Sequence, residues 1–588
     1  MKELSYLNKY LAKYKGRLLL GTLFIIVSNV FKVLMPEILK DATNSIKIVL
    51  DNISSYTSDD IASIAINLGL LFMLFALLNG VFLFLTRQTI IIMSRLIEYD
   101  LKNEIYDKYQ RLSMSFYKRN NTGDLMNRIS EDVGKVRMYL GPAIMYTINV
   151  AVLIVMVVSF MIKISPQLTL YVLIPLPIMS ILVYKVSTLI NKKSEVTQVQ
   201  QSKLSTFVQE TFSGIRVLKA YNREAFFKNE FDQESRNYKM ASLSLAKTNA
   251  FFIPVIVSLI GLSTIIIVYF GGLKSINNEL SIGEILQFIF YINMLTWPIA
   301  SIGWVTSLIQ RAAASQKRVN EFLQENPEIT DKKNSVTFEN GNIIFNNVCF
   351  TYSNTNTEAL KNVSYEIEKG KTLAITGKTG SGKSTLANLI CRLFDVNTGE
   401  VSINGMNVKH IQKKSLRTNI GYVPQEVFLF SDTIANNIAF GNKSGEPNNQ
   451  EVESAAKTAA VYDNIIQFEN GFNTVIGERG ITLSGGQKQR ISIARAIINN
   501  PEILIFDDCL SAVDTKTEEE ILSNLEEIMN NKTSIIISHR ISSIKNADYI
   551  IVLDKGLISE KGTHSELINN KGYYSTTFEK QLLEKKMN

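Results

Sequence analysis

Residues 373–384 read LAITGKTGSGKS, a short apolar run followed by a loop that matches the pattern G-x-x-x-x-G-K-[ST]. The apolar run predicts a buried strand, and residues 385–393 predict a helix after the loop. Glycines let backbone N–H groups curl around phosphate oxygens, and the positive end of the following helix faces the same anion. This stretch therefore predicts a nucleotide-phosphate site at the end of a strand in an α/β domain.

The residues of this loop have distinct expected roles. We expect Lys383 to reach the β- and γ-phosphates of a nucleotide and Ser384 to place its hydroxyl on Mg²⁺. A second metal ligand is expected in ILIFD (503–507), where an apolar strand ends in Asp507. Many buried strands end in aspartate, so this assignment depends on the partnership with the loop. The nucleotide-binding residues expected here are Gly377, Lys378, Thr379, Gly380, Ser381, Gly382, Lys383, Ser384 and Thr385.

The rest of the C-terminal half supports an α/β fold. Short apolar runs at 373–376, 503–506 and 534–537 alternate with helical stretches, a pattern typical of a largely parallel sheet. We assign residues 341–580 to this ATP-binding domain. The polar residues 317–340 are expected to form a linker, and 581–588 a polar tail.

The N-terminal half is apolar in a different way. Spanning a bilayer takes about 20 apolar residues, and six stretches meet that requirement. They are residues 18–35, 61–86, 138–162, 164–184, 248–273 and 285–310. We therefore expect an all-α transmembrane domain of six helices over residues 1–316.

The distribution of charge predicts how these helices are oriented. Five basic residues, Lys2, Lys9, Lys13, Lys15 and Arg17, precede the first stretch, whereas the loop after it is acidic. Since cytosolic flanks are enriched in lysine and arginine, both termini are expected in the cytosol. The loops after the second and fourth stretches are long, charged and helix-forming. We expect a multi-pass protein of the cytoplasmic membrane whose helices extend far into the cytosol.

Composition restricts the possible partners. The net charge is +8, and 46% of the residues are hydrophobic. Basic loops beside membrane helices and a phosphate site account for this charge, so no nucleic-acid partner is expected. The cysteines, Cys349, Cys391 and Cys509, lack metal-ligand spacing and are expected to be free thiols.

The motif LSGGQ, at residues 483–487, lies between the phosphate loop and Asp507. It is the signature sequence of ABC ATPases, and the chain resembles the MsbA-like or multidrug group of ABC exporters. The resemblance implies a second anion cradle that closes on ATP held by an opposing ATPase domain. Its residues would be Ser484, Gly485, Gly486 and Gln487. With one such motif, the chain resembles a half-transporter that must dimerise.

Other positions follow the family pattern in order. Tyr352 resembles the aromatic residue that stacks on adenine, and Gln425 resembles the glutamine that contacts Mg²⁺ and the attacking water. His539 resembles the histidine that contacts the γ-phosphate. Asp507 resembles the Walker B aspartate that orients Mg²⁺.

Four segments resemble the parts that couple ATPase and membrane domains in these exporters. Glu478 resembles the X-loop contact, and residues 511–514 resemble the D-loop. Residues 116–128 and 210–221 resemble the two cytosolic coupling segments, and both fall in the long internal loops.

One position departs from the family pattern. Most of these ATPases have a catalytic glutamate after the Walker B aspartate, and here the residue is Asp508. Its carboxylate is drawn back by roughly 1 Å, a misplacement that can cost about 10²-fold in rate unless the backbone or a water compensates. Heterodimeric exporters often carry one subunit with aspartate here, so the resemblance leaves both a heterodimer and a homodimer open. In the heterodimer, Asp508 would belong to a slow site.

The resemblance implies ATP-driven export or flipping of a hydrophobic or amphipathic substrate, such as a drug, lipid or peptide. ATP and Mg²⁺ would be the cofactors, with Asp508, His539 and Gln425 as catalytic residues. The partners would be a second half-transporter, membrane lipid and the substrate. Two alternatives are an ATP-gated channel or regulatory ABC subunit, and a soluble ABC ATPase, which the six spans disfavour.

Overall fold

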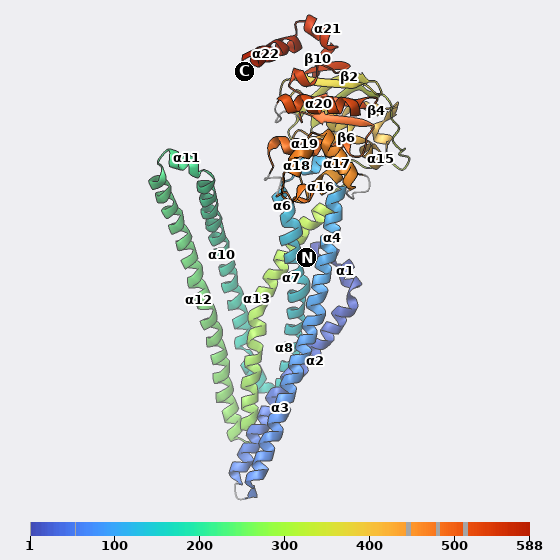
Figure 1. The fold of residues 1–588 in the computed structure, drawn as a ribbon. Coiled ribbons are helices and arrows are strands. Elements are labelled where there is room, and N and C mark those ends of the chain that lie inside the picture. The colour runs from blue at the N-terminus through green and yellow to red at the C-terminus, as the bar shows by residue number, and fades with distance from the viewer. Residues whose placement is uncertain (1, 53–54, 443–447, 478–482, 510–514, 588) are drawn as a thin grey trace. The chain divides into compact units, whose positions relative to one another are not determined.

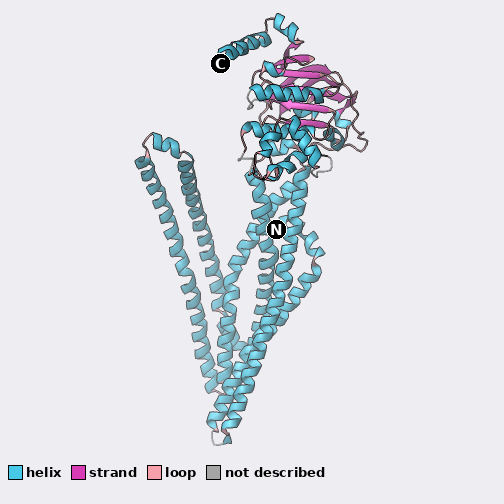
Figure 2. Ribbon diagram, in the orientation of Figure 1, coloured by secondary structure: helices cyan, strands magenta, loops and turns pink. Residues whose placement is uncertain are grey.

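The computed structural model describes residues 2–52, 55–442, 448–477, 483–509 and 515–587. The chain forms two compact units. One comprises Met1–Gln110 and Gly123–Glu325, and the other comprises Arg111–Thr122 and Asn326–Asn588. Every strand among the described residues lies in the second unit, and the first is helical (Figure 2). The expected order, six helical spans followed by an α/β ATPase domain, is confirmed.

Six helices of the described residues are long and apolar enough to cross a membrane. They run Lys15–Asp51, Ser58–Arg111, Thr122–Ile164, Pro166–Ser213, Glu224–Ile276 and Ile282–Gln324. Their segments are α2 (Lys15–Asp51), α3 (Ser58–Thr86), α4 (Ile92–Arg111), α6 (Thr122–Asn127), α7 (Val133–Met138), α8 (Ile144–Ile164), α9 (Pro166–Leu173), α10 (Pro175–Ser213), α12 (Glu224–Ile276) and α13 (Ile282–Gln324), and Figure 1 labels all of them except α9. Short helices η1 (Lys2–Leu7), α1 (Asn8–Lys13), α5 (Met114–Arg119) and α11 (Ile215–Ala220) precede or connect them.

These helices run well beyond the apolar stretches that predicted them. α12 has 53 residues, which at 1.5 Å per residue is about 80 Å, against a hydrocarbon core of about 30 Å. It packs along α10, and α11 closes the turn between the two (Figure 1). Long helical extensions outside the apolar core were expected from the charged loops.

Tight caps set the short connections between helices. The side chains of Thr57 and Ser281 each accept a hydrogen bond from the backbone N–H three residues on, at Asp60 and Glu284. The carboxylates of Asp60 and Glu284 in turn accept hydrogen bonds from the backbone N–H groups of the two cap residues. This reciprocal pairing satisfies N–H groups that a helix start leaves without partners. Ser165 caps α9 in the same position and leaves almost no loop after α8.

The second unit, which we call the ATPase unit because it contains the expected ATP-binding domain, has two sheets. The first has six strands in the order β10-β9-β3-β8-β7-β6, and its pairs are parallel except β10 with β9. The second is an antiparallel sheet in the order β2-β1-β4-β5. The strands are β1 (Ile343–Tyr352), β2 (Thr357–Ile367), β3 (Thr372–Gly377), β4 (Thr398–Ile403), β5 (Met406–Asn407), β6 (Ile420–Val423), β7 (Ile503–Asp507), β8 (Thr533–Ile537), β9 (Tyr549–Asp554) and β10 (Leu557–Gly562). The parallel core matches the sequence expectation, and the antiparallel sheet is an addition to it.

Helices complete this unit. They are α14 (Lys383–Ile390), α15 (Lys413–Thr418), α16 (Ile434–Ala439), α17 (Asn449–Thr458), α18 (Tyr462–Ile466), α19 (Gly485–Ile497), α20 (Thr515–Met529), α21 (His564–Asn569) and α22 (Tyr573–Met587). β3 and β7 are buried along almost their whole length, as expected for strands inside a parallel sheet covered on both faces.

The segment after α13 joins the ATPase unit by backbone pairing. α13 continues to Gln324 because Val319 and Phe322, three residues apart, are both buried on one face. Beyond it, the Val336 N–H donates to the His410 carbonyl at 2.9 Å, and the Gln412 N–H donates to the Val336 carbonyl at 2.8 Å. The polar residues expected to link the domains are therefore partly docked.

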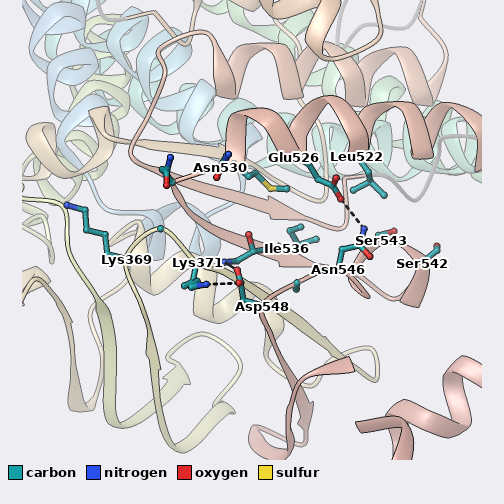
Figure 3. Close-up of a pocket in the computed structure, with 15 residues that line it drawn as sticks. Lys369, Lys371, Leu522, Glu526, Asn530, Ile536, Ser542, Ser543, Asn546 and Asp548 are labelled. Atoms are coloured by element: carbon teal, nitrogen blue, oxygen red, sulfur yellow. Dashed lines mark hydrogen bonds and ion pairs between the residues drawn. The ribbon is translucent and has the colours of Figure 1, made fainter. Parts of the chain in front are cut away.

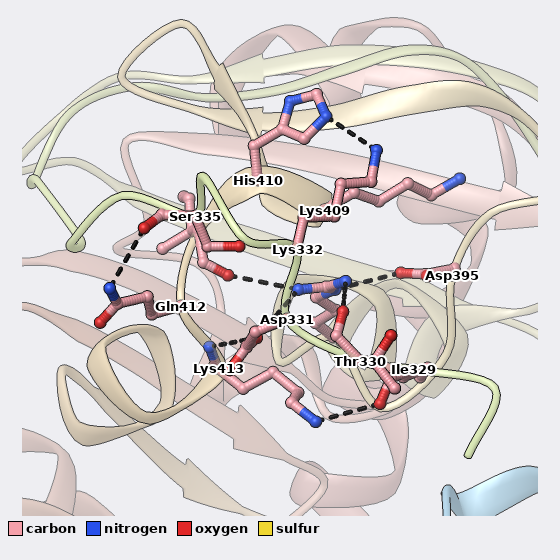
Figure 4. Close-up of polar contacts among 12 residues, drawn as sticks. Ile329, Thr330, Asp331, Lys332, Ser335, Asp395, Lys409, His410, Gln412 and Lys413 are labelled. Atoms are coloured by element: carbon pink, nitrogen blue, oxygen red, sulfur yellow. Dashed lines mark hydrogen bonds and ion pairs between the residues drawn. The ribbon is translucent and has the colours of Figure 1, made fainter. Parts of the chain in front are cut away.

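Side chains reinforce this docking (Figure 4). The Gln412 side chain donates to the Ser335 carbonyl, and the Lys413 N–H donates to the Asp331 carboxylate. Arg392, only 2% exposed, donates to the carbonyls of Thr330 and Ile411, each at 3.2 Å. A buried guanidinium, which follows shortly after α14, thus holds the docked segment in place.

Candidate nucleotide site

The phosphate loop lies between β3 and α14, where glycine is required by geometry. Gly377, Gly380 and Gly382 have φ angles of 140°, 78° and 104°. A Cβ at Gly377 would lie 2.1 Å from the Leu553 carbonyl oxygen, and one at Gly382 would lie 2.4 Å from that of Ala359. The loop can therefore adopt this path only with glycine at those two positions.

Within the loop, polar groups are arranged for an anion. Lys383 is 7% exposed, and its Nζ donates to the carbonyls of Gly377 at 3.0 Å and Lys378 at 2.9 Å. Burial lowers the pKa of Lys383, and the carboxylates of Asp508 and Asp507 oppose that shift. The Ser381 hydroxyl is buried without a hydrogen-bond partner among the described residues. A buried cation and a buried hydroxyl fit a triphosphate group.

Two oxygen donors meet at the start of α14. The Ser384 hydroxyl donates a hydrogen bond to Asp507 Oδ1 at 3.0 Å. Asp507 is 2% exposed, and burial raises the pKa of its carboxyl while the Ser384 hydrogen bond opposes the shift. Hydroxyl and carboxylate oxygens are ligands that Mg²⁺ prefers, with water and nucleotide phosphates completing its shell. The donor set fits Mg²⁺.

Four adjacent strands bring the other predicted residues to the same edge. β3, β8, β7 and β6 are neighbours in that order, and the carboxyl ends of parallel strands meet at one edge. His539 follows β8, Asp508 follows β7 and Gln425 follows β6. Burial and then Lys383 lower the pKa of His539, while Asp508 opposes them.

Asp508 has an unusual backbone conformation. Its φ is 46°, and its N–H donates to the Ile537 carbonyl at 2.8 Å. Aspartate and asparagine enter this left-handed region more readily than other side-chain-bearing residues. The backbone conformation at this position therefore suits an aspartate.

Tyr352 ends β1 beside the phosphate loop. Its hydroxyl lies 3.1 Å from the Thr385 hydroxyl. Phe350 and Phe394 meet its ring edge to face, with centroids 4.8 Å and 5.5 Å away. We call Phe350, Tyr352 and Phe394 the aromatic platform.

The signature residues form a second, separate N-terminus. Ser484 caps α19 by accepting from the Gln487 N–H at 3.3 Å, and the Gln487 side chain accepts from the Ser484 N–H at 2.9 Å. Ser484 and Gly485 are exposed, whereas Gly486 and Gln487 are half-buried. Among the described residues, no hydrogen bond joins this motif to the phosphate loop. Glu478 and residues 511–514 lie outside the described residues.

The two expected coupling segments divide differently between the units. Residues 210–221 form the end of α10 and α11 in the helical unit. Residues 116–122, which include the end of α5, belong to the ATPase unit, whereas residues 123–128 belong to the helical unit. Glu328 accepts hydrogen bonds from the Ser115 hydroxyl and from Arg119, and the Ser113 hydroxyl accepts from the Ile329 N–H at 3.0 Å. The segment could be identified from the sequence, but the role of Glu328 could not. No local pattern around Glu328 indicates partners as distant in sequence as Ser115 and Arg119.

A pocket of about 650 Å³ lies elsewhere in the ATPase unit (Figure 3). It opens where β3 and β8 begin, the edge opposite to the phosphate loop. Several of its polar groups are paired: Lys371 forms an ion pair with Asp548 at 3.0 Å, and the Asn546 amide donates to Glu526 at 3.0 Å. None of the residues predicted for the nucleotide site lines it.

Comparisons with known proteins agree with this geometry. Residues 18–299 match the model of the ABC transporter transmembrane region, and residues 360–511 match the ABC transporter model. The probable multidrug resistance ABC transporter ATP-binding/permease protein YheI of Bacillus subtilis is 34% identical over 99% of this chain and 98% of its own length. An ATP-dependent lipid A-core flippase of Aromatoleum aromaticum is 35% identical over 83% of this chain and 80% of its own.

A solved structure resembles the whole fold. It is that of a bacterial Atm1-family ABC exporter with ATP bound, with a TM-score of 0.79, 25% sequence identity, and coverage of 97% of this chain and 99% of the other. The chain therefore belongs to the ABC transporters, as a half-transporter of the multidrug or lipid exporter type whose ATPase domain couples ATP hydrolysis to transport.

Proposed function

We propose that two ATP molecules are bound between two ATPase domains, each nucleotide touched by both. One face is formed by the phosphate loop with Tyr352 and Gln425, and the other by Ser484 and Gly486 of the opposing domain. The observation that supports this arrangement is the exposed, capped start of α19, which makes no hydrogen bond to the phosphate loop of its own chain among the described residues. ABC half-transporters act as dimers, which supplies the second domain.

Hydrolysis is assigned to the carboxyl edge of the sheet. Ser384 and Asp507 would hold Mg²⁺, which would supply charge neutralisation at the phosphates when bound. Lys383 and His539 contact the β- and γ-phosphates. Gln425 and Asp508 orient the attacking water. Catalysis by this set is positioning and electrostatics, as in other phosphoryl transfers.

Asp508 sets the rate of this site. Its carboxylate is one methylene shorter than that of glutamate, and the left-handed backbone with its bond to Ile537 resists a compensating shift. We therefore propose a slow site on this chain, with Ser484 to Gln487 completing the site of the opposing domain. A second copy or a different half-transporter with glutamate satisfies this scheme equally.

The transported substrate is proposed to be hydrophobic or amphipathic. The relatives are described as multidrug resistance proteins and lipid A-core flippases. Closure of the two ATPase domains on ATP would shift the membrane domain toward its outward-facing state, because the sandwich contacts exist only in the closed form. Both termini are proposed to lie in the cytosol of a cytoplasmic membrane.

Complementation between two defective chains tests the shared sites. Lys383→Met disables the phosphate loop, and Ser484→Arg disables the signature; we expect each variant alone to lose ATPase activity in nanodiscs. Co-expressed with different tags and purified as mixed dimers, they retain one intact site and regain activity. If the mixed dimers stay as inactive as the single variants, both halves of a site come from one chain and the proposal is wrong. Wild-type chains purified alone give the reference rate and show whether one subunit suffices.

A further inference from the structure

A lysine of the first coupling segment lies on the aromatic platform. Lys118 Nζ is 4.2 Å from the centroid of the Tyr352 ring and 5.0 Å from that of Phe394. A cation within about 6 Å of a ring face is attracted by the ring quadrupole. Lys118, Tyr352 and Phe394 all belong to the ATPase unit. α5 therefore contacts the ring of Tyr352, on which the proposed adenine site depends.

The position of Lys118 is fixed by its neighbours on α5. Ser115 and Arg119 flank it and both bind Glu328, and the Ser113 hydroxyl holds the Ile329 backbone. A pocket of about 160 Å³ is lined by Ser115, Lys118, Glu328, Tyr352 and Phe394. The ammonium is therefore presented to Tyr352 by an anchored helix.

A nucleobase and this ammonium cannot share one ring face. Stacked aromatic atoms lie about 3.5–4 Å apart, which is the space that Lys118 Nζ occupies over Tyr352. We propose that Lys118 is a positioning residue that competes with the nucleobase for Tyr352, so that ATP binding releases α5 from the aromatic platform. This inference rests on the proposed role of Tyr352 in adenine binding.

The displaced ammonium has an alternative partner. Glu328 and Asp395 line the same pocket and supply carboxylates beside the aromatic platform. If the Lys118 ammonium moved from the Tyr352 ring to one of these carboxylates, its positive charge would still have a partner, and the tilt of α5 would change. The first coupling segment could in this way report whether a base is stacked.

Binding measurements on the full chain in detergent, without Mg²⁺, test the competition. Lys118→Met removes the charge and keeps an unbranched side chain, and we expect ATP to bind about two- to fivefold more tightly. Tripolyphosphate, which has no base, is expected to bind as in the wild type. Lys118→Arg keeps a cation for the ring and should restore wild-type ATP affinity. Arg111→Met removes an exposed charge at the last residue of α4, which belongs to the same unit, and should change the binding of neither ligand.

The outcomes separate this inference from the proposed function. Equal or weaker ATP binding by Lys118→Met, or equal changes for ATP and tripolyphosphate, would overturn the competition. Tyr352→Ala should weaken ATP selectively over tripolyphosphate. If it does so while Lys118→Met has no effect, only the competition fails. If Tyr352→Ala does not distinguish the two ligands, the adenine site and the competition fail together.

Discussion

Ser384 Oγ and Asp507 Oδ1 are joined by a hydrogen bond of 3.0 Å between the start of α14 and the end of β7. The two residues are far apart in sequence: Ser384 follows β3 by way of the phosphate loop, Asp507 ends β7, and β8 lies between these two strands in the sheet. The bond joins the helix after the phosphate loop to the edge of the sheet, and its two oxygen atoms are of the kind that Mg²⁺ prefers as ligands. A bound Mg²⁺ would be held by these same two side chains, Ser384 and Asp507.

Ser384→Ala removes one of these ligands. We expect Mg²⁺-dependent ATPase activity to fall by at least about tenfold and the Mg²⁺ concentration for half-maximal rate to rise. Initial rates across a Mg²⁺ titration measure both. Ser415→Ala, which removes a hydroxyl that accepts from the Phe338 N–H in the same unit, is the matched control. An unchanged Mg²⁺ dependence in Ser384→Ala would contradict the assignment.

Asp507→Asn tests the cost of the buried carboxylate. Because the pKa of Asp507 is raised in the folded protein, folding holds a proton that the unfolded chain has already lost. Stability is therefore lost as pH rises through the folded pKa. We expect Asp507→Asn to raise the melting temperature of the nucleotide-free protein at neutral pH and to lose that advantage toward pH 4. A lower melting temperature at pH 7 would show that Asp507 is stabilised by its neighbours instead.

Two glycines of the phosphate loop should differ sharply in tolerance. Gly377→Ala places a Cβ 2.1 Å from the Leu553 carbonyl and should abolish ATP binding, because backbone must move. Gly380→Ala meets no atom within 4 Å, so it carries only the left-handed backbone cost of about 1–2 kcal/mol. We expect it to fold and retain ATP binding within roughly tenfold. ATP affinity and melting temperature of both variants decide the matter; similar losses would mean that the loop changes path.

Asp508→Glu extends the carboxylate toward the attacking water. If the site is slow because the Asp508 carboxylate lies too far from the attacking water, the ATP turnover of purified chains should rise by about tenfold or more. The upper limit is the roughly 10²-fold cost of a 1 Å misplacement. Asp508→Asn should abolish what turnover remains. Robust wild-type turnover that glutamate does not improve would show that aspartate is a competent base here. Single-turnover and steady-state ATPase rates distinguish chemistry from product release.

Arg392 should be a stability determinant of the ATPase unit. Arg392→Ala leaves the carbonyls of Thr330 and Ile411 and the Asp395 carboxylate without this donor, which we expect to cost about 2–4 kcal/mol. Because Arg392 has a φ of 48°, Arg392→Gly loses the same bonds but is free of the left-handed strain that alanine keeps, and it should be about 1 kcal/mol more stable than the alanine variant. Thermal unfolding followed by loss of ATP binding ranks them, with the exposed Lys414→Ala as control. Equal melting of Arg392→Ala and wild type would contradict this role.

The sequence predicted best where a local pattern has one structural meaning. The loop after residue 376 needs glycines for its path, so both its position and the flanking β3 and α14 could be predicted. The apolar stretch 248–273 identified a span but not its length, because hydropathy marks contact with lipid whereas α12 continues from Glu224 as a polar helix. The exposed start of α19 could be predicted only through the signature motif.

Non-local pairing set the limit. Arg392 looks like any charged residue after a helix, and only the fold shows that it is buried against Thr330 and Ile411. Lys118 and Tyr352 lie in different halves of the chain, and no spacing rule connects them. β1 was missed because Asn346 and Asn347 interrupt its apolar pattern at a bulge, where the pairing with β2 shifts register.

The pairing of Val336 with Ile411 bears on how this protein should be dissected. A recombinant ATPase fragment beginning at residue 341 would lack Val336 and Thr330, leaving the carbonyl of His410 and part of the Arg392 guanidinium without their protein partners. Beginning near Asn326 would retain both. Even that fragment would expose the rings of Tyr352 and Phe394, because α5 comes from the N-terminal half of the polypeptide. ATPase rates of the excised domain would therefore be those of an enzyme that lacks α5.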